Sequence, residues 1–412
     1  MSKDKEILII QNFGPIKDIK LDLKKFNVLI GKQATGKSTV AKVLAVCRYF
    51  SYIVDYHPLE RGSVGRIEGA FYKGLVEWGI GNYKKNETFI FYENKDYSIE
   101  ISSKNENINI GLDNNENYIF ESVPVLYDIL TPKSEKFKNL LKELKEIKPK
   151  NDNPHFNVID SDWQPSENFF RLNVKKVMNN PFYLPTERGL QSIFSLGKSP
   201  NYSDSLFNQL ASLYNISKSF KNETKIEPLG IYYKNENGKG LTRKNKESSY
   251  YKLSNGASGY QSTIPIVLTV KHYNENEKRN RTFIVEEPEQ NLFPTAQKKL
   301  IEFLIETVNE HKNQFLIPTH SPYILTTLSN LIYAHKIGTS EKGKYEDKVN
   351  DIISKKSWVD VKDIAVYYLN DGIAENMVNE EECTINLDNL DNVSEIINNE
   401  FDKLLTIETQ ND

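Results

Sequence analysis

The sequence contains little cysteine, no long hydrophobic run and no strong excess of charge of either sign. Its 412 residues include two cysteines, Cys47 and Cys383, which are too far apart in the sequence for a metal-binding pair. No run approaches the roughly 18 apolar residues of a membrane span, and the first residues lack the apolar core of a signal peptide. We therefore expect a cytoplasmic protein without disulfides that does not itself bind a membrane.

The charge balance also excludes one class of function. A net charge of −3 argues against a protein that coats nucleic acid without selectivity, although it leaves room for a local basic face. Hydrophobic residues make up 38% and charged residues 26% of the chain, which is typical of a folded soluble protein. The length predicts one large domain with lobes or two domains, and we expect Cys47 to be buried in an apolar helix.

Residues 31–39 match the Walker A pattern of a phosphate-binding loop. The apolar run 26–30 predicts a buried strand before the loop, and residues 39–46 predict a helix after it. Glycines let successive backbone N–H groups converge on an anion, and the helix N-terminus adds partial positive charge. Lys37 is placed to reach the β- and γ-phosphates, as a catalytic residue, and Ser38 to ligate Mg²⁺. The sequence therefore predicts binding of ATP with Mg²⁺ through Gly31, Lys32, Gln33, Ala34, Thr35, Gly36, Lys37, Ser38 and Thr39.

Two later apolar segments end in polar residues that suit nucleotide chemistry. Residues 282–285 predict a strand that Pro288 terminates, which places Glu286 to bind Mg²⁺ and Glu287 to orient an attacking water. Residues 314–318 predict a second strand, after which His320 is placed to hydrogen-bond a γ-phosphate. We predict Glu287 and His320 as catalytic residues alongside Lys37.

The order of these motifs resembles that of ABC-type ATPases, over residues 31–322. A serine-glycine segment at 253–262 stands where that superfamily has its signature, and residues 286–294 resemble the Glu-Glu-Pro-Glu-x-x-Leu-x-Pro run of OLD-type and RecF-like ATPases. These include ATPase subunits of anti-phage systems such as PARIS, Septu-type retron systems and Gabija. The resemblance implies an α/β ABC-type ATPase head, whose signature closes over ATP held by a second subunit. ATP would then join a homodimer, or a higher oligomer, and hydrolysis would release it.

The signature has two possible registers. Residues 253–256 match a Leu-Ser-x-Gly spelling, and residues 258–261 match a Ser-Gly-x-Gln spelling. We favour the second, because Ser258 and Gln261 have capping-box spacing, although Pro265 should then kink the helix. The alternative is that both serines only cap helices. The predicted nucleotide contacts of this segment are Ser254, Gly256, Ser258, Gly259 and Gln261.

The sequence departs from the family in three ways. Glu286 stands where most ABC enzymes have aspartate. No clear Gln-loop is visible; Glu187 or Gln191 could take that place, and a structural salt bridge is an equal expectation for Arg188. The last 70 or so residues lack the carboxylate arrangement of a Toprim nuclease. We therefore expect any nuclease, of Toprim or HNH type, on a separate polypeptide.

The predicted fold is α/β, a mixed sheet with crossover helices, interrupted by an α+β insertion. We divide it into residues 1–49 and 179–337 for the ATPase head, 50–178 for the insertion and 338–412 for a small C-terminal α/β extension. The finer predictions are two strands within 7–23, a strand at 181–185, hairpins joining 89–92 to 97–101 and 230–233 to 249–253, helices at 137–147 and 203–220, a loop at 148–167, alternating helices and strands over 256–335, a strand at 364–369 and a helix at 393–405.

Three functions fit these motifs. The first is an ATP-switched sensor or scaffold that controls a separate effector in anti-phage defence, with DNA or a phage component as the possible trigger. The alternative is a RecF-like DNA-repair or DNA-handling ATPase. A transporter motor is disfavoured by the OLD-like Walker B segment and the long insertion. DNA contact would use Lys234, Lys239, Arg243, Lys244, Lys246, Lys278, Arg279 and Arg281.

Overall fold

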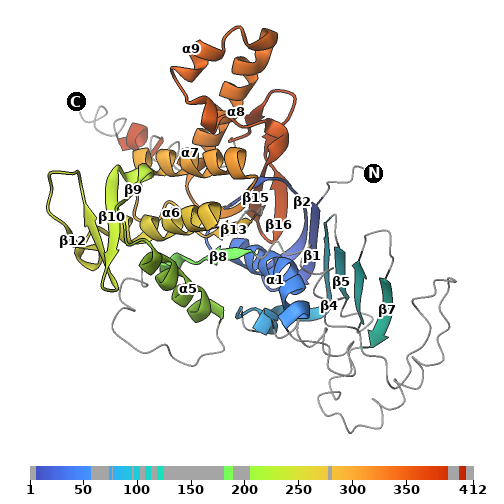
Figure 1. Cartoon of the computed structure of the whole chain (residues 1–412). Helices are drawn as coiled ribbons and strands as arrows, with labels where there is room; N and C mark the ends of the chain where they lie inside the picture. The colour runs from blue at the N-terminus through green and yellow to red at the C-terminus, as the bar shows by residue number, and fades with distance from the viewer. Residues whose placement is uncertain are drawn as a thin grey trace. The chain divides into compact units, whose positions relative to one another are not determined.

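The computed structural model describes most of the chain outside a large central segment (Figure 1). The described residues are 6–56, 74–76, 78–94, 97–102, 107–112, 118–124, 181–188, 205–276, 281–387 and 399–404. The predicted helix at 137–147, the predicted loop at 148–167, Gln191, Lys278 and Arg279 lie outside them. Among the described helices, none is both long and apolar enough to cross a bilayer.

The chain divides into two units, of which the first comprises residues 1–14 and 42–180. Its strands lie in the order β7-β6-β5-β4-β1 and pair antiparallel. The pairing of β4 with β5 confirms the predicted hairpin. The bounds are β1 Glu6–Phe13, β4 Lys84–Glu93, β5 Tyr97–Ser102, β6 Asn107–Leu112, β7 Tyr118–Pro124 and the short helix η1 Gly81–Tyr83.

Helix α1, Lys37–Tyr56, contributes its residues from Lys42 onward to this unit. Cys47 is fully buried in it, as predicted. The buried Arg48 pairs with Glu6 of β1 at 2.6 Å, and Tyr92 of β4 donates to the same carboxylate oxygen at 2.7 Å. A buried arginine in this unit therefore has a carboxylate partner.

The second unit comprises residues 15–41 and 181–412 and contains a mixed sheet in the order β2-β16-β15-β3-β14-β13-β8. Strands β15, β3, β14, β13 and β8 run parallel, so their carboxyl ends meet at one edge. That edge is where a doubly covered parallel sheet places its ligands. The bounds are β2 Ile16–Leu23, β3 Phe26–Ile30, β8 Phe182–Leu184, β13 Thr282–Val285, β14 Gln314–Thr319, β15 Ile364–Asn370 and β16 Ile373–Asn376.

The central strands are buried along their whole length, which explains their uninterrupted apolar sequences. Phe283 lies between Phe315 and Tyr273 in the core, with ring centroids 5.1 and 6.2 Å away. Helices and strands alternate from α6 to α8, as predicted. The helices are α5 Ser205–Ser219, α6 Ser258–Asn276, α7 Pro294–His311, α8 Pro322–Thr339 and α9 Glu346–Asn350, and the smaller elements are η5 Glu227–Leu229, η6 Leu253–Asn255, η7 Ser340–Gly343, η8 Lys355–Ser357, η9 Val361–Asp363, β17 Val378–Asn379 and β18 Thr384–Ile385.

A separate four-stranded sheet in this unit corrects one prediction. Its order is β12-β11-β10-β9, so Ile231–Glu236 (β10) pairs with Lys239–Arg243 (β11) and not with residues 249–253. The connecting residues Asn237 and Gly238 have φ of 53° and 78°, which is the left-handed pair of a type I′ turn. The Asn-Gly turn closes a tight hairpin before the chain can reach the predicted partner. The other strands are β9 Thr224–Ile226 and β12 Tyr251–Lys252.

The C-terminal strand prediction is confirmed, because residues 364–370 form β15 beside β3. Residues 399–404 are helical, in agreement with the second half of the predicted closing helix, and residues 393–398 lie outside the described part.

Candidate nucleotide-binding site

The Walker A loop connects β3 to α1 at the carboxyl edge of the parallel sheet. Ala34 and Gly36 have left-handed φ values of 60° and 99°, which turn the loop into a concave row of amides. A Cβ on Gly31 would lie 2.2 Å from the carbonyl oxygen of Leu369 in β15, so only glycine fits there. Residues 32–34 and Ser38 are exposed, which leaves the loop and the first turn of α1 open to a ligand.

The Lys37 ammonium lies inside this loop. Its Nζ donates to the carbonyl oxygens of Gly31 at 2.8 Å and Lys32 at 2.7 Å. Burial lowers the pKa of Lys37 to about 8, against the opposing effect of nearby glutamates. The side chain is therefore held at the loop by carbonyl oxygens that a phosphate oxygen can replace.

Glu286 directly follows β13 and is 6% exposed. Its amide donates to the carbonyl of Leu184 in the neighbouring β8 at 3.0 Å. Its Oε1 atom is buried, and the Tyr183 phenol is a hydrogen-bond neighbour of this carboxylate. Burial, and then the nearby charge of Glu286, raises the pKa of the Tyr183 phenol well above its usual range. The carboxylate is thus a buried oxygen donor at the end of β13, next to the Tyr183 phenol.

Glu287 turns away from the strand in a left-handed conformation, with φ of 42°. Its amide donates to the carbonyl of Pro318 at 2.8 Å. Its carboxylate Oε1 lies 3.4 Å from Nε2 of His320. The other ring nitrogen, Nδ1, lies 3.4 Å from Nζ of Lys37. The structure therefore brings together the three predicted catalytic residues, with the imidazole between the ammonium and the carboxylate.

Arg188 has a different environment from the salt bridge that the sequence suggested. It is fully buried, and its acceptors within the described chain are main-chain carbonyls. Burial lowers its pKa to about 10, and the nearby glutamates oppose this effect, so the guanidinium stays charged at neutral pH. The acceptors are Pro185 at 3.0 Å, Ser262 at 2.8 Å, Glu286 at 2.6 Å and Glu287 at 2.7 Å. Glu187 beside it is exposed, and its Gln-loop role stays a prediction.

Glu289 and Gln297 hold the turn that carries His320, and the sequence assigned neither a role. Glu289 Oε1 accepts from the Thr319 hydroxyl at 2.7 Å and from the His320 amide at 2.8 Å. The Ser321 hydroxyl and the Gln297 Oε1 lie 2.6 Å apart. The spacing of two residues from Glu287 was the available signal for Glu289, whereas a glutamine within the helix α7 gives none.

The predicted signature segment forms η6 and the start of α6. The amides of Tyr260 and Gln261 both donate to the Ala257 carbonyl, so Ala257 is the N-cap. The predicted capping box with Ser258 at the N-cap is therefore wrong. Gln261 Nε2 instead donates to the Gly256 carbonyl at 3.0 Å and the Ser254 carbonyl at 3.4 Å. These bonds connect residues 258–261, one candidate signature, to residues 253–256, the other. Helix α6 continues through Pro265 to Asn276.

This segment also packs against the loop that follows Glu287. A Cβ on Gly259 would lie 2.6 Å from the carbonyl oxygen of Asn291, and the Ser262 hydroxyl donates to the Gln290 carbonyl at 2.8 Å. Ser254 and Ser258 are exposed. Which of the two serines contacts a nucleotide stays open.

The residues present fit a magnesium-bound nucleotide. Within the described ranges no cluster of three or more His, Cys, Asp or Glu side chains could hold a metal by itself. Mg²⁺ in phosphate-transfer sites relies on one or two protein oxygens together with phosphates and water. The hydroxyl of the exposed Ser38 and the buried carboxylate of Glu286 are oxygen donors of that kind.

The basic residues proposed for DNA contact are partly engaged within the chain. Lys234 lies 3.6 Å from Glu236 and 4.5 Å from the ring centroid of Tyr250. Arg243 pairs with Glu223, and Arg281 lies 3.9 Å from the ring centroid of Tyr273. The carboxylates of Glu236 and Glu223 therefore offset part of the positive charge of Lys234 and Arg243.

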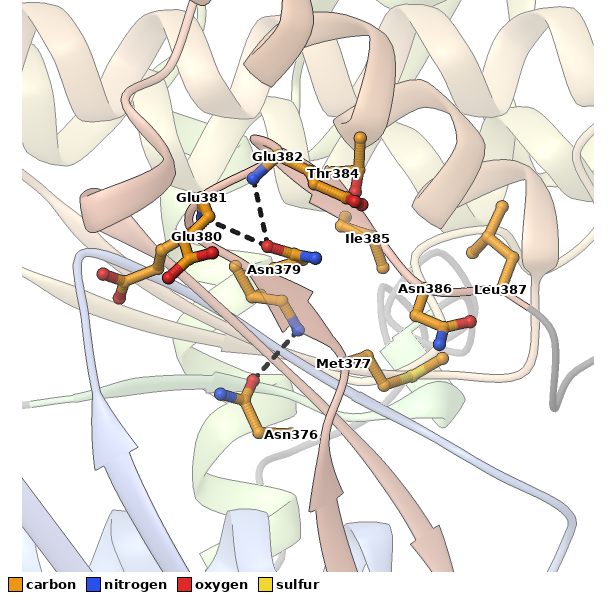
Figure 2. Close-up of a pocket in the computed structure, with 11 residues that line it drawn as sticks. Asn376, Met377, Asn379, Glu380, Glu381, Glu382, Thr384, Ile385, Asn386 and Leu387 are labelled. Carbon is orange, nitrogen blue, oxygen red and sulfur yellow. Dashed lines mark hydrogen bonds between the residues drawn. The ribbon is translucent and has the colours of Figure 1, made fainter.

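A cavity of about 800 Å³ lies beside β17 and β18 (Figure 2). It is lined by residues 376–382 and 384–387, none of which belongs to the motifs above. The Asn379 side chain caps its turn by accepting from the amides of Glu381 and Glu382 at 3.1 and 3.0 Å. The Asn376 side chain likewise accepts from the Val378 amide at 3.1 Å, so the hydrogen bonds drawn in Figure 2 stabilise local backbone turns.

Comparison with solved structures gives SMC head domains with 8–11% identity and TM-scores of 0.36–0.40. An SmcHead bound to the C-winged helix domain of ScpA is 8% identical, with a TM-score of 0.40, and covers 90% of this chain and 96% of its own. An SMC head domain from Thermotoga maritima is 11% identical, with a TM-score of 0.36, and covers 90% and 98%. An Smc head domain with an extended coiled coil, bound to the C-terminal domain of ScpA derived from Pyrococcus furiosus, is 9% identical, with a TM-score of 0.36, and covers 90% and 95%.

No curated protein sequence matches the chain significantly. The sequence profile of a family described as AAA ATPase domain (AAA_15) matches residues 6–325. The match includes the Walker A loop, the signature segment, both acidic residues after β13 and His320. The chain, a P-loop protein with a mixed α/β sheet, belongs to the AAA ATPase domain family.

Proposed function

We propose that this protein binds and hydrolyses ATP, with Lys37, Glu287 and His320 as its catalytic residues. The observation that carries the proposal is the position of the His320 ring, 3.4 Å from both the Lys37 ammonium and the Glu287 carboxylate, beside a complete Walker A loop. Polar side chains from the first turn of α1 and from the ends of β13 and β14 converge there. Such convergence at the carboxyl edge of parallel strands supports phosphoryl transfer to water.

Each residue has a distinct role in this proposal. Lys37 exchanges its carbonyl acceptors in the loop for oxygens of the β- and γ-phosphates, and the loop amides hold the remaining phosphate charge. Glu287 accepts a hydrogen bond from the attacking water and so orients it, and His320 donates to the γ-phosphate. Ser38 and Glu286 would hold Mg²⁺, which supplies charge neutralisation at the phosphates when bound.

We further propose that a second copy of the chain completes the site. The polar residues Ser254 and Ser258 are exposed, as is the tip of the Walker A loop. Phe293 and Tyr323, which follow the two catalytic strand ends, are 76% and 53% exposed. Exposed aromatic residues beside a polar site are typical of a protein interface. Control of a separate effector, in anti-phage defence, extends this proposal from the resemblance to OLD-type ATPases.

The test combines ATPase rates with light scattering. Glu287→Gln should retain ATP binding, slow hydrolysis by at least about a hundredfold and accumulate dimers with ATP. Lys37→Ala should lose ATP binding and stay monomeric. Ser258→Arg or Ser254→Arg, placed in the Glu287→Gln background, should prevent the dimer and so identify the register. Hydrolysis by Glu287→Gln at the wild-type rate would show that another residue orients the water.

A further inference from the structure

Arg188 is a buried cation whose hydrogen-bond acceptors within the described chain are main-chain carbonyls. Its guanidinium is fully buried and donates to four carbonyl oxygens in three segments of the chain. The buried Arg48 of the other unit, in contrast, has Glu6 as a partner. Nearby glutamates, Glu289 foremost, stabilise the buried charge of Arg188, but the hydrogen bonds of its guanidinium within the described chain go to carbonyl oxygens, which its rigid set of donors holds in one arrangement.

Two of the four bonds fix the backbone on both sides of Glu287. Nη1 donates to the Glu286 carbonyl at 2.6 Å and Nη2 to the Glu287 carbonyl at 2.7 Å. These carbonyls belong to consecutive peptide planes, and a planar guanidinium presents its donors in a rigid fork. The Arg188 guanidinium therefore fixes the orientation of both peptide planes, and these planes determine the direction in which the Glu287 side chain leaves the backbone. The residue is held with φ of 42°, which a glutamate seldom adopts unaided.

A third bond connects the same guanidinium to α6. Nε donates to the Ser262 carbonyl at 2.8 Å, within the first two turns of the helix that begins at Ser258. The Ser262 hydroxyl also donates to the Gln290 carbonyl. Helix α6 is therefore bonded directly to the loop after Pro288 and, through Arg188, to the residues before it. The beginning of α6 and the backbone of Glu287 are thus parts of one hydrogen-bonded junction.

We propose that Arg188 is a positioning residue for ATP hydrolysis, which holds the Glu287 carboxylate toward His320 and ties it to α6. The inference rests on the proposed function, in which Glu287 orients the attacking water. Lysine cannot substitute, because a single ammonium on a flexible stem cannot bond both peptide planes and α6 in one fixed arrangement.

The experiment compares Arg188→Lys with Arg48→Lys, the matched buried arginine, in wild-type and Glu287→Gln backgrounds. Arg188→Lys should lower kcat about a hundredfold, the loss expected from displacing a catalytic group by about 1 Å, with KM for ATP nearly unchanged. In single-turnover assays it should add no further loss to Glu287→Gln, because both changes disable the same step. Arg48→Lys should lower the melting temperature and leave kcat unchanged.

Two results would overturn the inference: an unchanged kcat in folded Arg188→Lys, or the same fractional loss in both backgrounds. A wild-type rate for Glu287→Gln alone would instead refute the proposed function. If Arg188→Lys does not fold, Arg188→Met takes its place, because it removes the buried charge and all four hydrogen bonds while filling a similar volume. It should lower kcat at least about a hundredfold with KM for ATP nearly unchanged, and an unchanged kcat in the folded variant would reject the inference.

Discussion

The pKa of Lys37 predicts that ATP binding weakens as pH rises above neutrality. With a pKa of about 8 in the free protein, roughly nine in ten Lys37 side chains are charged at pH 7 and roughly one in eleven at pH 9. A bound triphosphate stabilises the ammonium, so the complex holds its proton to higher pH than the free protein does. The apparent Kd for ATP should therefore increase about tenfold between pH 7 and pH 9.

Lys37 should affect folding stability in the opposite direction: as pH rises, ATP binding weakens but the contribution of Lys37 to the free energy of unfolding increases. The ordinary lysine pKa is 10.5, so between about 8 and 10.5 the unfolded chain binds more protons than the folded one. The contribution of Lys37 to the free energy of unfolding therefore rises with pH across this window. General alkaline damage would weaken binding and stability together, which distinguishes it from titration of this residue.

The assay is a titration with a fluorescent ATP analogue and Mg²⁺ at pH 7, 8 and 9, with urea unfolding in the same buffers. Lys37→Met is the control for stability, because methionine fills a similar volume without a titrating group. The stability difference between this variant and the wild type should change in favour of the wild type as pH rises. An apparent Kd that stays constant from pH 7 to pH 9 would refute the assigned pKa and its cause.

Two further changes test the contacts around the site. Glu289→Ala removes the acceptor of the Thr319 hydroxyl and His320 amide and should lower kcat by about 10- to 100-fold, whereas Glu289→Gln, which keeps an acceptor oxygen, should retain most activity. Steady-state ATPase rates measure both, and equal losses would contradict a positioning role for the acceptor. Gly259→Ala should lower the free energy of unfolding by about 1–3 kcal/mol in urea melts, because its Cβ would lie 2.6 Å from the Asn291 carbonyl. Gly256→Ala, whose nearest neighbour would be 3.1 Å away, should lower it less, and the reverse order would contradict the close approach.

The sequence predicted correctly those parts of the fold whose residue types are informative without knowledge of their neighbours in space. Buried parallel strands need apolar side chains on both faces, so residues 26–30 and 282–285 are recognisable as strands without any partner. The Walker A glycines are equally informative, because only glycine tolerates the approach of the Leu369 carbonyl to position 31. Polar residues placed directly after such strands then converge in space, as Glu287 and His320 do.

Contacts to main-chain atoms could not be predicted in this way. The four acceptors of Arg188 are carbonyls, which every residue possesses, so the sequence gives no indication of its partners. The N-cap of α6 was misplaced for a related reason: Ser258 has the preferred side chain, but the first helical hydrogen bonds go to the carbonyl of Ala257. The hairpin error had a visible signal, since Asn237-Gly238 is a turn sequence that should have outweighed the more distant strand pairing.

The conformation of Glu287 shows why stability and catalysis make different demands here. A non-glycine residue with φ of 42° costs about 1–3 kcal/mol, and glycine or asparagine would adopt the same backbone with less strain. The strain persists because the Glu287 amide is fixed by Pro318 and its carbonyl by Arg188. In this conformation the Glu287 carboxylate lies beside His320, while the side chain of Glu286, the preceding residue, is buried. Two adjacent acids thereby reach different partners, so that one is available to bind Mg²⁺ while the other orients water.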